Sequence, residues 1–377
     1  MAVTEKKPIR ILHIINGIGS GGAEKDIMSW YHNLDTNQIQ FDFLIRSDQK
    51  YYESQINQLG GKIYQVAPFP KKIIRNIIET EKFFKTHKEY QIIHVHGNTL
   101  FYIIPLIIAK RYRIKCRIMH IHSTKACSPV SALGHYCNRL FINMFATEKI
   151  ACSSQAGIFG FGRNNRYRIL KNGVNVSEYC NNSKEIKEKY GKEFNTDADI
   201  IKVGHVGKFL PVKNHSFIIK IFREFHKKYP SKLFLVGMGP ERSDIEKKIK
   251  EYGLEKSVIF LGERSDVPQL LHYFDIMLFP SLYEGVPLVP IEAQAASLKT
   301  IISDCITDEV CMTQFIKKMS LKQSPTIWAK EMKRFLDKDI KEDTVEVLRQ
   351  HGYDITGVVS FLSKFYMKMA DDRITVR

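Results

Sequence analysis

Short apolar runs that favour β-strands alternate with helical stretches along most of this chain, and this alternation restricts the fold more than any other feature. In the first half the strand-like runs cover 9–15, 41–45 and 92–95, and the helical stretches after them cover 23–33, 51–59 and 100–109. Apolar strands joined by helices are typical of a parallel sheet covered by helices. The sequence therefore predicts an α/β fold.

The alternation stops once and then restarts. Residues 149–152 and 168–170 have the pattern of two last strands, and 181–199 is polar, charged and poor in bulky apolar residues. Strand-like runs resume at 201–206, 233–236, 258–261, 276–279 and 300–302, and the sequence beyond Thr307 has a helical pattern. We expect a Rossmann-like βαβ domain over 1–180, a linker over 181–199 and a second such domain over 200–355.

The chain is strongly basic, and its charge is uneven. The formal charge is +17, and residues 1–175 hold 25 Lys and Arg against 11 Asp and Glu, which leaves +14 there. Basic clusters lie at Lys71, Lys72 and Arg75, at 110–117 and at 163–171. Such clusters attract phosphorylated substrates or an anionic membrane surface, and they also occur on plain soluble surfaces. Nucleic acid is not an expected partner, because no zinc-finger spacing, RNP-like motif or basic zipper accompanies the charge.

Cysteine usage and apolar run length indicate where the protein works. The seven cysteines include no C-x-x-C pair, which argues against a disulfide framework and a structural zinc site. The first ten residues lack the apolar core of a signal peptide, and the longest apolar run, 100–109, is about half of a bilayer span. We expect a cytoplasmic protein that either has a plain basic surface or rests peripherally on the inner face of the cell membrane.

A glycine-rich loop follows the first strand-like run. Its glycines let the backbone approach a ligand, and the next helix offers N-terminal amides to an anion or a sugar. Gly17, Gly19 and Gly22 also satisfy G-x-G-x-x-G, so an NAD-dependent oxidoreductase is an alternative, and a purely structural tight turn is another. The dinucleotide fingerprint expects an acidic residue at the end of the second strand, where this chain has Arg46, with Asp48 as the nearest acid.

Two later loops contain charged residues where strands end. Lys208 follows the run 201–206 and Lys213 precedes the next helix, so two cations lie where an open α/β sheet binds ligands, unless they are solvated surface lysines. Glu284 follows the run 276–279, and Glu292 comes eight residues later, after a proline that suits the first turn of a helix. Carboxylates accept hydrogen bonds from the hydroxyls of a ribose or hexose, although Glu292 could also serve only its own helix.

Histidines occur in two H-x-H pairs, His94 with His96 and His120 with His122, each near the end of a predicted strand. We expect the members of each pair to face opposite sides of the sheet, with one of them in the core or supporting its loop. This arrangement predicts no zinc site. His122 is better placed to reach a cleft because two hydroxyl residues follow it.

Asp197 and Asp199 match a D-x-D metal motif. They lie in the polar stretch ahead of a strand, and we interpret them as a solvated turn. The sequence therefore predicts no metal site and no metal cofactor.

Taken in order along the chain, these motifs resemble those of the retaining glycosyltransferases of family four, which have the GT-B fold, particularly the bacterial capsule and exopolysaccharide enzymes. The likeness covers nearly the whole chain. Its motifs are GGAE at 21–24, HVHG at 94–97, ACS at 151–153, NGV at 172–174, VGK at 206–208, KNH at 213–215, and Glu284 with Glu292 as an E-x7-E pair.

The resemblance implies an α/β GT-B fold, in which two Rossmann-like βαβ domains face each other across a cleft and a C-terminal helix, 356–377, crosses back to the first domain. It assigns the diphosphate of a nucleotide-sugar donor to Lys208 and Lys213, the donor sugar to Glu284 and the ribose to Glu292. Backbone groups complete the donor pocket around Gly285, Val286, Leu288 and Val289.

On the side of the first domain, the resemblance places Gly22 along the diphosphate and acceptor. It places His122, with His120 as second choice, near the acceptor. Two positions depart from the family pattern. Lys208 stands where the family usually has Arg and lacks its planar fork, and 295–299 lacks the usual Gly and Pro.

We therefore hypothesise an enzyme that moves a hexose or N-acetylhexosamine from a nucleotide-diphosphate sugar, foremost a UDP-sugar, with retention of configuration. The expected acceptor is a saccharide or a polyprenyl-diphosphate-linked saccharide in capsule, exopolysaccharide or O-antigen synthesis. Lysines, a helix dipole and backbone amides would stabilise the leaving group in place of a metal. The alternatives are an NAD-dependent oxidoreductase and a nucleotide-sugar-binding protein without catalytic activity.

Overall fold

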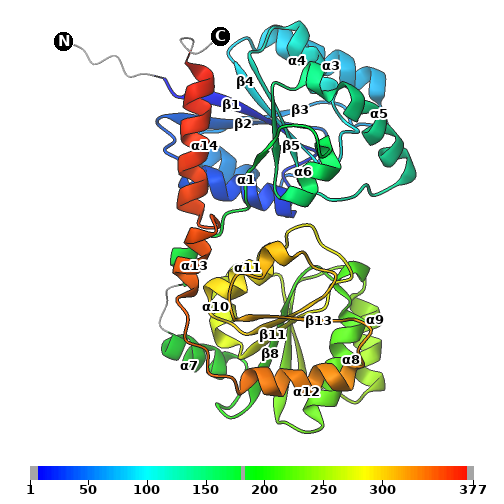
Figure 1. Cartoon of the computed structure of the whole chain (residues 1–377), viewed down its shortest axis with the longest axis vertical. Coiled ribbons are helices and arrows are strands. Elements are labelled where there is room, and N and C mark those ends of the chain that lie inside the picture. Colours follow the sequence, from blue (N-terminus) through cyan, green and yellow to red (C-terminus); the bar gives the residue numbers. More distant parts are fainter. Residues whose placement is uncertain (1–6, 180–182, 372–377) are drawn as a thin grey trace, which may run out of the picture. The chain divides into compact units, whose positions relative to one another are not determined.

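The computed structural model describes residues 7–179 and 183–371, which form two compact units (Figure 1). The first unit contains the described residues up to Gly173 and those from Gly352 onward, and the second runs from Val174 to His351. Each unit holds one parallel β-sheet with helices on both faces, which confirms the predicted α/β fold. No helix in the described chain has the length and apolar character needed to span a membrane.

The sheet of the first unit has seven strands in the order β3-β2-β1-β4-β5-β6-β7. The chain leaves β1 toward β2 and β3 on one side, then returns to continue from β4 on the other side, so the direction of connection reverses between β1 and β4. The strands are β1 (Ile9–Ile14), β2 (Ile39–Ile45), β3 (Ile63–Gln65), β4 (Ile92–Gly97), β5 (Cys116–Ile121), β6 (Glu148–Ala151) and β7 (Arg168–Ile169).

Alternating side chains of this sheet enter two separate cores. Ile11 and Phe41 point to the face covered by α1, α2 and α14, whereas Leu12 and Ile93 point to the face covered by α3 to α6. The helices are α1 (Gly22–Asn33), α2 (Glu53–Gln58), α3 (Ile73–Thr86), α4 (Ile104–Arg111), α5 (Pro129–Phe145), α6 (Ser154–Phe161) and α14 (Ile355–Ala370).

The last helix, α14, belongs to the first unit. It packs against α1 and buries Leu362 and Tyr366 in the same core as Ile11 (Figure 1). The Tyr366 hydroxyl lies 2.7 Å from Nδ1 of His94 on β4. The return of the C-terminal helix to the first domain is therefore confirmed for the residues up to 371, and the predicted residues 372–377 lie outside the described chain.

Both H-x-H pairs lie on a single face of the first sheet, together with His13 of β1. Hydrogen bonds join His13 to His96, His94 to His120, and His96 to His122, and the rings of the first two pairs are also stacked. The prediction that each pair spans both faces is wrong. Side chains of a strand alternate with a period of two, so residues two positions apart point to the same side.

The sheet of the second unit has six strands in the order β10-β9-β8-β11-β12-β13, so its reversal lies between β8 and β11. Figure 1 shows α8, α9 and α12 on one face and α7, α10 and α11 on the other. The strands are β8 (Ile201–Val206), β9 (Ser231–Val236), β10 (Val258–Gly262), β11 (Ile276–Phe279), β12 (Thr300–Ser303) and β13 (Ile316–Met319). The helices are α7 (Ser183–Glu193), α8 (His215–His226), α9 (Arg242–Glu251), α10 (Val267–Tyr273), α11 (Leu288–Ala295), α12 (Pro325–Leu336) and α13 (Thr344–Gln350).

Two segments of the second unit differ from their sequence patterns. Within 181–199, for which we predict a linker, α7 packs on α10 and fully buries Tyr190, whose hydroxyl donates to Asp266 at 2.6 Å. This aromatic anchor and the ion pairs of Lys187 with Asp275 and Glu193 with Arg264 hold the otherwise polar helix. The helical pattern beyond Thr307 hides the edge strand β13, because Lys317 and Lys318 occupy its centre and pair with acidic side chains.

Candidate functional site

Each unit has a place where its sheet topology favours a ligand. In open α/β sheets, ligands bind beyond the carboxyl ends of the strands where the direction of connection reverses. In the first unit that place lies beyond β1 and β4, and in the second beyond β8 and β11. Nearly all of the predicted site residues follow one of these four strands.

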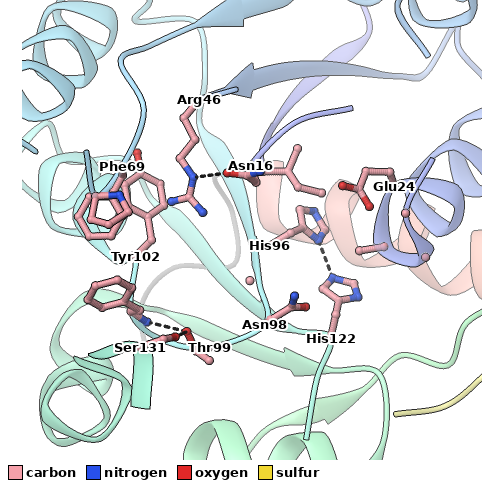
Figure 2. Close-up of a pocket in the computed structure, with 17 residues that line it drawn as sticks. Asn16, Glu24, Arg46, Phe69, His96, Asn98, Thr99, Tyr102, His122 and Ser131 are labelled. Carbon is pink, nitrogen blue, oxygen red and sulfur yellow. Dashed lines mark hydrogen bonds between the residues drawn. The ribbon is translucent and has the colours of Figure 1, made fainter. Parts of the chain in front are cut away.

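A pocket of about 570 Å³ occupies this place in the first unit (Figure 2). Its walls come from the loops that follow five strands, β1 to β5, and from the start of α5. Polar groups converge on it from several directions, and aromatic rings close one side. The side chains include Asn16, Glu24, Arg46, Phe69, His96, Asn98, Thr99, Phe101, Tyr102, His122 and Ser131, and the backbone of Gly21 and Gly22 completes the wall.

Arg46 brings a positive charge to this pocket. Its guanidinium carbon lies 3.9 Å from the centre of the Tyr102 ring, and its Nε donates to the Asn16 side chain at 3.2 Å (Figure 2). Burial lowers the pKa of Arg46, although a guanidinium stays charged at neutral pH. Among the described residues, Nη1 is buried without a hydrogen-bond partner and the side chain has no ion pair. Such a group suits an anionic ligand, because phosphate or carboxylate oxygens accept from the fork of Arg.

A row of hydrogen-bonded histidines leads from the pocket into the core. His122 Nε2 lies 2.9 Å from His96 Nδ1 (Figure 2). His96 Nε2 in turn lies 2.9 Å from His13 Nδ1. Burial lowers the pKa of His122 to about 4 and of His13 to about 3, and it lowers that of His96 well below the ordinary value. These imidazoles are therefore neutral at pH 7. Each can donate through one nitrogen and accept through the other, so the hydrogen bond between His122 and His96 couples their tautomers.

His120, the second candidate, lies on the same face of the sheet as His122 but does not line the pocket. It is fully buried, stacks on Trp30 with ring centres 5.9 Å apart, and lies 3.2 Å from His94. His122 is the member of this pair that lines the pocket. The ring nitrogens of His13, His94 and His96, and those of His96, His120 and His122, lie close enough together for each trio to hold a metal ion. The expectation of no metal cofactor remains a prediction.

The glycine-rich loop contributes an open stretch of backbone. A Cβ added at Gly22, the first residue of α1, would meet no atom within 4 Å. The fold itself therefore does not require glycine at this position, whereas a ligand lying against the backbone would. Asp48, the nearest acid to the end of β2, is exposed and accepts from the Gln65 side chain at 2.7 Å.

In the second unit, Lys213 and Glu284 form an ion pair across the reversal point. Lys213 Nζ lies 2.7 Å from Glu284 Oε1, and both side chains are largely buried. The ammonium also lies 4.6 Å from the centre of the Phe279 ring. The loops are fixed to each other because Asn214 donates to the Pro280 carbonyl at 3.2 Å. An ammonium has three N–H donors, so Lys213 keeps two for phosphate oxygens, and Glu284 keeps one oxygen for a hydroxyl.

Lys208 lies on the same loop but is exposed. A Cβ at its neighbour Gly207 would lie 3.3 Å from Cε of Lys213, so the two lysines share one end of the sheet. A Cβ at Gly237, after β9, would lie 2.2 Å from the Gly207 carbonyl oxygen, so this loop needs glycine there for packing. Among the described residues, Lys208 forms none of the ion pairs found. Its charge remains available to an anion.

Glu292 occupies the fifth position of α11 and is 4% exposed. Its charge helps to raise the pKa of Tyr179, for which burial is the larger cause. Tyr179 belongs to a 3-10 helix (Val176–Tyr179) that contacts α11. Gly285, Val286, Leu288 and Val289 form the loop and first turn before Glu292, where a helix leaves amides without intrahelical partners. The structure thus joins Lys213 and Glu284 directly. It places Glu292 one turn into α11, the helix that follows the loop of Glu284.

The sequence analysis gave no site role to Arg46 and Tyr102, which line the pocket, or to His13, which lies behind His96 in the core. Arg46 appeared only as a misfit to the dinucleotide pattern, although its place after β2 was a usable signal. Tyr102 lies in a predicted helix that starts later, at Ile104. Asp197 and Asp199 are exposed in a turn, as predicted.

Comparison with known proteins agrees with this arrangement. A model of the family "Glycosyl transferases group 1" matches residues 186–350, nearly the whole second unit. The chain is 32% identical over 373 residues to the putative glycosyltransferase EpsF of Bacillus subtilis, covering 95% of this chain and 96% of EpsF. It is 22% identical to the capsular polysaccharide biosynthesis glycosyltransferase CapH of Staphylococcus aureus, covering 95% and 99%. It is 26% identical to the UDP-Gal:alpha-D-GlcNAc-diphosphoundecaprenol alpha-1,3-galactosyltransferase of Escherichia coli, covering 62% of each chain.

A solved structure shows the same fold. HepE of Anabaena, in complex with UDP and glucose, superposes with a TM-score of 0.75 at 17% identity, covering 96% of this chain and all of HepE. At this level of identity the likeness shows the fold alone, which is the GT-B arrangement of two Rossmann-like units.

Proposed function

This chain belongs to the glycosyl transferases group 1 family, and from that premise we propose that it moves a hexose or N-acetylhexosamine from a UDP-sugar to a saccharide acceptor. The ion pair of Lys213 with Glu284 is the observation that carries this proposal. It offers ammonium donors and a carboxylate side by side at the reversal point of the second unit. A sugar diphosphate requires both, one for its phosphates and one for its hydroxyls.

The leaving diphosphate would gain most of its stabilisation from the protein. In this proposal Lys208 and Lys213 lie along the phosphates, and the N-terminus of α11 adds its amides and dipole. Glu284 accepts from the sugar hydroxyls and Glu292 from the ribose. The acceptor hydroxyl forms its bond to the anomeric carbon on the face from which the diphosphate departs and gives its proton to the departing diphosphate, so configuration is retained.

We propose that the pocket of the first unit receives the acceptor, and that the acceptor carries a phosphate group. Arg46 supports this, because its charge faces the pocket without a carboxylate partner among the described residues. The Escherichia coli relative is named for a diphosphoundecaprenol acceptor. A polyprenyl-diphosphate-linked saccharide of capsule or exopolysaccharide synthesis at the inner face of the cell membrane satisfies both observations. His122 would hydrogen-bond the sugar.

A donor screen tests the reaction. Purified protein would be incubated with UDP- and GDP-sugars, and thermal shift and product formation would be measured. A UDP-sugar should raise the Tm by mass action, and NAD should not. Stabilisation by NAD alone would overturn the proposal. Stabilisation by a UDP-sugar without transfer or hydrolysis above background would support the alternative of an inactive nucleotide-sugar-binding protein, which Lys208 in place of Arg motivates.

We also propose that the reaction needs no metal. Activity should persist in EDTA, because protein cations take the place of a divalent ion at the diphosphate. The same experiment covers the histidine trios, since a catalytic metal held there would be removed as well. Loss of activity in EDTA that manganese or zinc restores would contradict this part of the proposal.

A further inference from the structure

One whole side of α5 exposes apolar side chains to solvent. Within its 17 residues only His135 and Ile142 are buried, and no residue of the helix is acidic. At 100° per residue the exposed apolar residues form one continuous stripe. They are Val130, Leu133, Tyr136, Leu140, Phe141 and Met144, with exposed fractions between 51% and 78%. A stripe of this size is uncommon on a surface that meets only water.

The first half of α3 has its polarity reversed. Ile73, Ile74, Ile77 and Ile78 are exposed, whereas the polar residues Asn76 and Thr80 are fully buried. The buried Asn76 donates to the Ala67 carbonyl at 2.6 Å and accepts from the Tyr102 hydroxyl at 3.0 Å. Folding alone would favour the opposite orientation, with isoleucine inside. The outward isoleucines therefore serve something other than the core.

These two helices belong to one face of the first unit. The helix α4 packs against both α3 and α5, and all three cover the same side of the sheet (Figure 1). The acidic side chains of α3 at this surface are already paired, Glu79 with Arg75 and Glu81 with Arg111 of α4.

Cations surround the apolar side chains. Lys71 and Lys72 are exposed just before α3, and Lys125 is exposed shortly before α5. At the end of α5, Lys110 lies 5.6 Å from the Phe145 ring and Lys149 donates to Asn143. Apolar side chains bordered by basic ones are the combination that holds a protein at the interface of an anionic bilayer.

We propose that this face, defined by the exposed apolar residues of α3 and α5 with Lys71 and Lys72, rests on an anionic lipid bilayer. The apolar side chains enter the headgroup region and the lysines contact lipid phosphates. This inference supplies a location for the acceptor of the proposed function, and its vesicle test needs neither donor nor catalysis. Failure of the docking face and failure of the proposed reaction are therefore distinguishable.

The pocket of the first unit opens next to this face. Phe69 and Pro70 line the pocket, and the exposed isoleucines of α3 begin three residues later. Ser131 also lines the pocket, between the exposed Val130 and Leu133 of α5. An acceptor anchored in the bilayer by a lipid tail would thus have a short path to Arg46.

Vesicle binding tests the docking face directly. The full chain would be floated with vesicles of equal parts phosphatidylcholine and phosphatidylglycerol, and with phosphatidylcholine alone. We expect binding to the mixed vesicles that weakens as salt rises, because salt screens the lysines. Leu133→Ser with Leu140→Ser should reduce binding at least tenfold, since each change removes a leucine that would otherwise be buried in lipid.

A control variant makes the same number of apolar-to-serine changes at exposed positions outside this face. Tyr51→Ser with Ile327→Ser removes two apolar residues of 63% and 45% exposure that lie outside the face, and it should bind as the wild type does. Lys71→Gln with Lys72→Gln should weaken binding to mixed vesicles roughly 30-fold, at about 1 kcal/mol per lysine. All altered side chains are exposed, so the Tm of each variant should stay near that of the wild type.

A fluorescent reporter separates insertion from loose attraction. Both native tryptophans, Trp30 and Trp328, are fully buried and will not contact lipid. In the Leu140→Trp variant, brominated phosphatidylcholine should quench the new tryptophan, whereas in Tyr51→Trp it should not. Unchanged binding of the double-serine variant, binding indifferent to lipid charge and salt, or equal quenching of both reporters would overturn the proposal. A stable dimer in solution that Leu133→Ser with Leu140→Ser dissociates would assign the face to a second copy instead.

Discussion

The two reversal points have the same strand topology but are lined by different charged and polar side chains. In the first unit, neutral histidines, the guanidinium of Arg46 and the carboxylate of Glu24 line a pocket, and burial keeps the imidazoles uncharged. In the second, an ammonium and a carboxylate form a partly buried ion pair beside an exposed lysine. The comparison shows that the same strand topology can present two different sets of polar side chains to a ligand. The hydroxyls of the proposed acceptor suit the neutral imidazoles and its phosphate suits Arg46, whereas a departing diphosphate suits the lysines of the second unit.

The largest effect that we predict is a difference between the two units in their stability against acid. His13, His94, His96, His120 and His122 stay neutral in the folded first unit and bind protons on unfolding below about pH 6.5. Each buried neutral imidazole makes its full contribution to the free energy of unfolding above that pH. The contribution is lost as the pH falls toward the pKa in the folded state, which is about 4 for His122. The slope is up to about 1.4 kcal/mol per pH unit for each imidazole.

Fluorescence can follow each unit separately. Trp30 belongs to the first unit and Trp328 to the second, so Trp328→Phe and Trp30→Phe leave one reporter each. We expect the Trp30 signal to change at higher pH, because the described part of the second unit buries fewer histidines, His205 and His215 among them. A first change at Trp328 would contradict the comparison.

Lys213→Ala should give the next largest effect. Removing a preorganised donor from a developing charge costs about 2.7 to 4 kcal/mol, so kcat should fall by roughly 10² to 10³. Lys213→Arg should restore part of the rate, and Lys247→Ala, on the exposed side of α9, should change nothing. Wild-type turnover in Lys213→Ala would remove the second reversal point from the mechanism.

Arg46→Met should act on the acceptor and not on the donor. A hydrogen bond to a charged group contributes about 1.5 to 3 kcal/mol, so kcat/KM for a phosphorylated acceptor should fall by roughly 10- to 150-fold. Donor hydrolysis and the KM for the donor should stay the same. An equal loss with an acceptor that lacks phosphate would show that Arg46 only supports the pocket wall through Tyr102.

Gly22→Ala should give the smallest effect, on binding alone. The new methyl group meets no protein atom, and alanine favours a helix, so the Tm should hold or rise slightly. A ligand that lies against this backbone would be displaced, with a rise in KM of about tenfold, or 1.4 kcal/mol. Unchanged KM values for donor and acceptor would mean that neither approaches Gly22.

The sequence predicts the architecture well because parallel strands are buried on both faces. Runs such as 233–236 and 276–279 are continuous and apolar, and both proved to be strands. The edge strand β13 was missed because an edge needs no apolar centre. The helices α3 and α5 were also missed, and in both the exposed apolar residues weaken the usual amphipathic pattern.

The candidate site was predictable only in part. Lys213 and Glu284 follow strands that are adjacent in the sheet, so loop position alone indicated that they meet. Predicting the contacts between the histidines requires two things. Residues two positions apart in a strand must be placed on the same face, and β1, β4 and β5 must be known to lie next to one another in the sheet. The place of Arg46 directly after β2 was a usable signal for the pocket, whereas its contact with Tyr102 was not predictable, because Tyr102 comes from a different loop.

The buried amide of Asn76 affects how quickly this protein attaches to a lipid bilayer. Rotating α3 to hide its isoleucines would strand that amide without its two partners, a loss of about 1 to 3 kcal/mol. The helix is therefore locked in its outward orientation before any lipid is present. Attachment then needs no refolding and no ordering of a segment, so we expect it to proceed in a single kinetic phase, at a rate set by diffusion and electrostatic attraction.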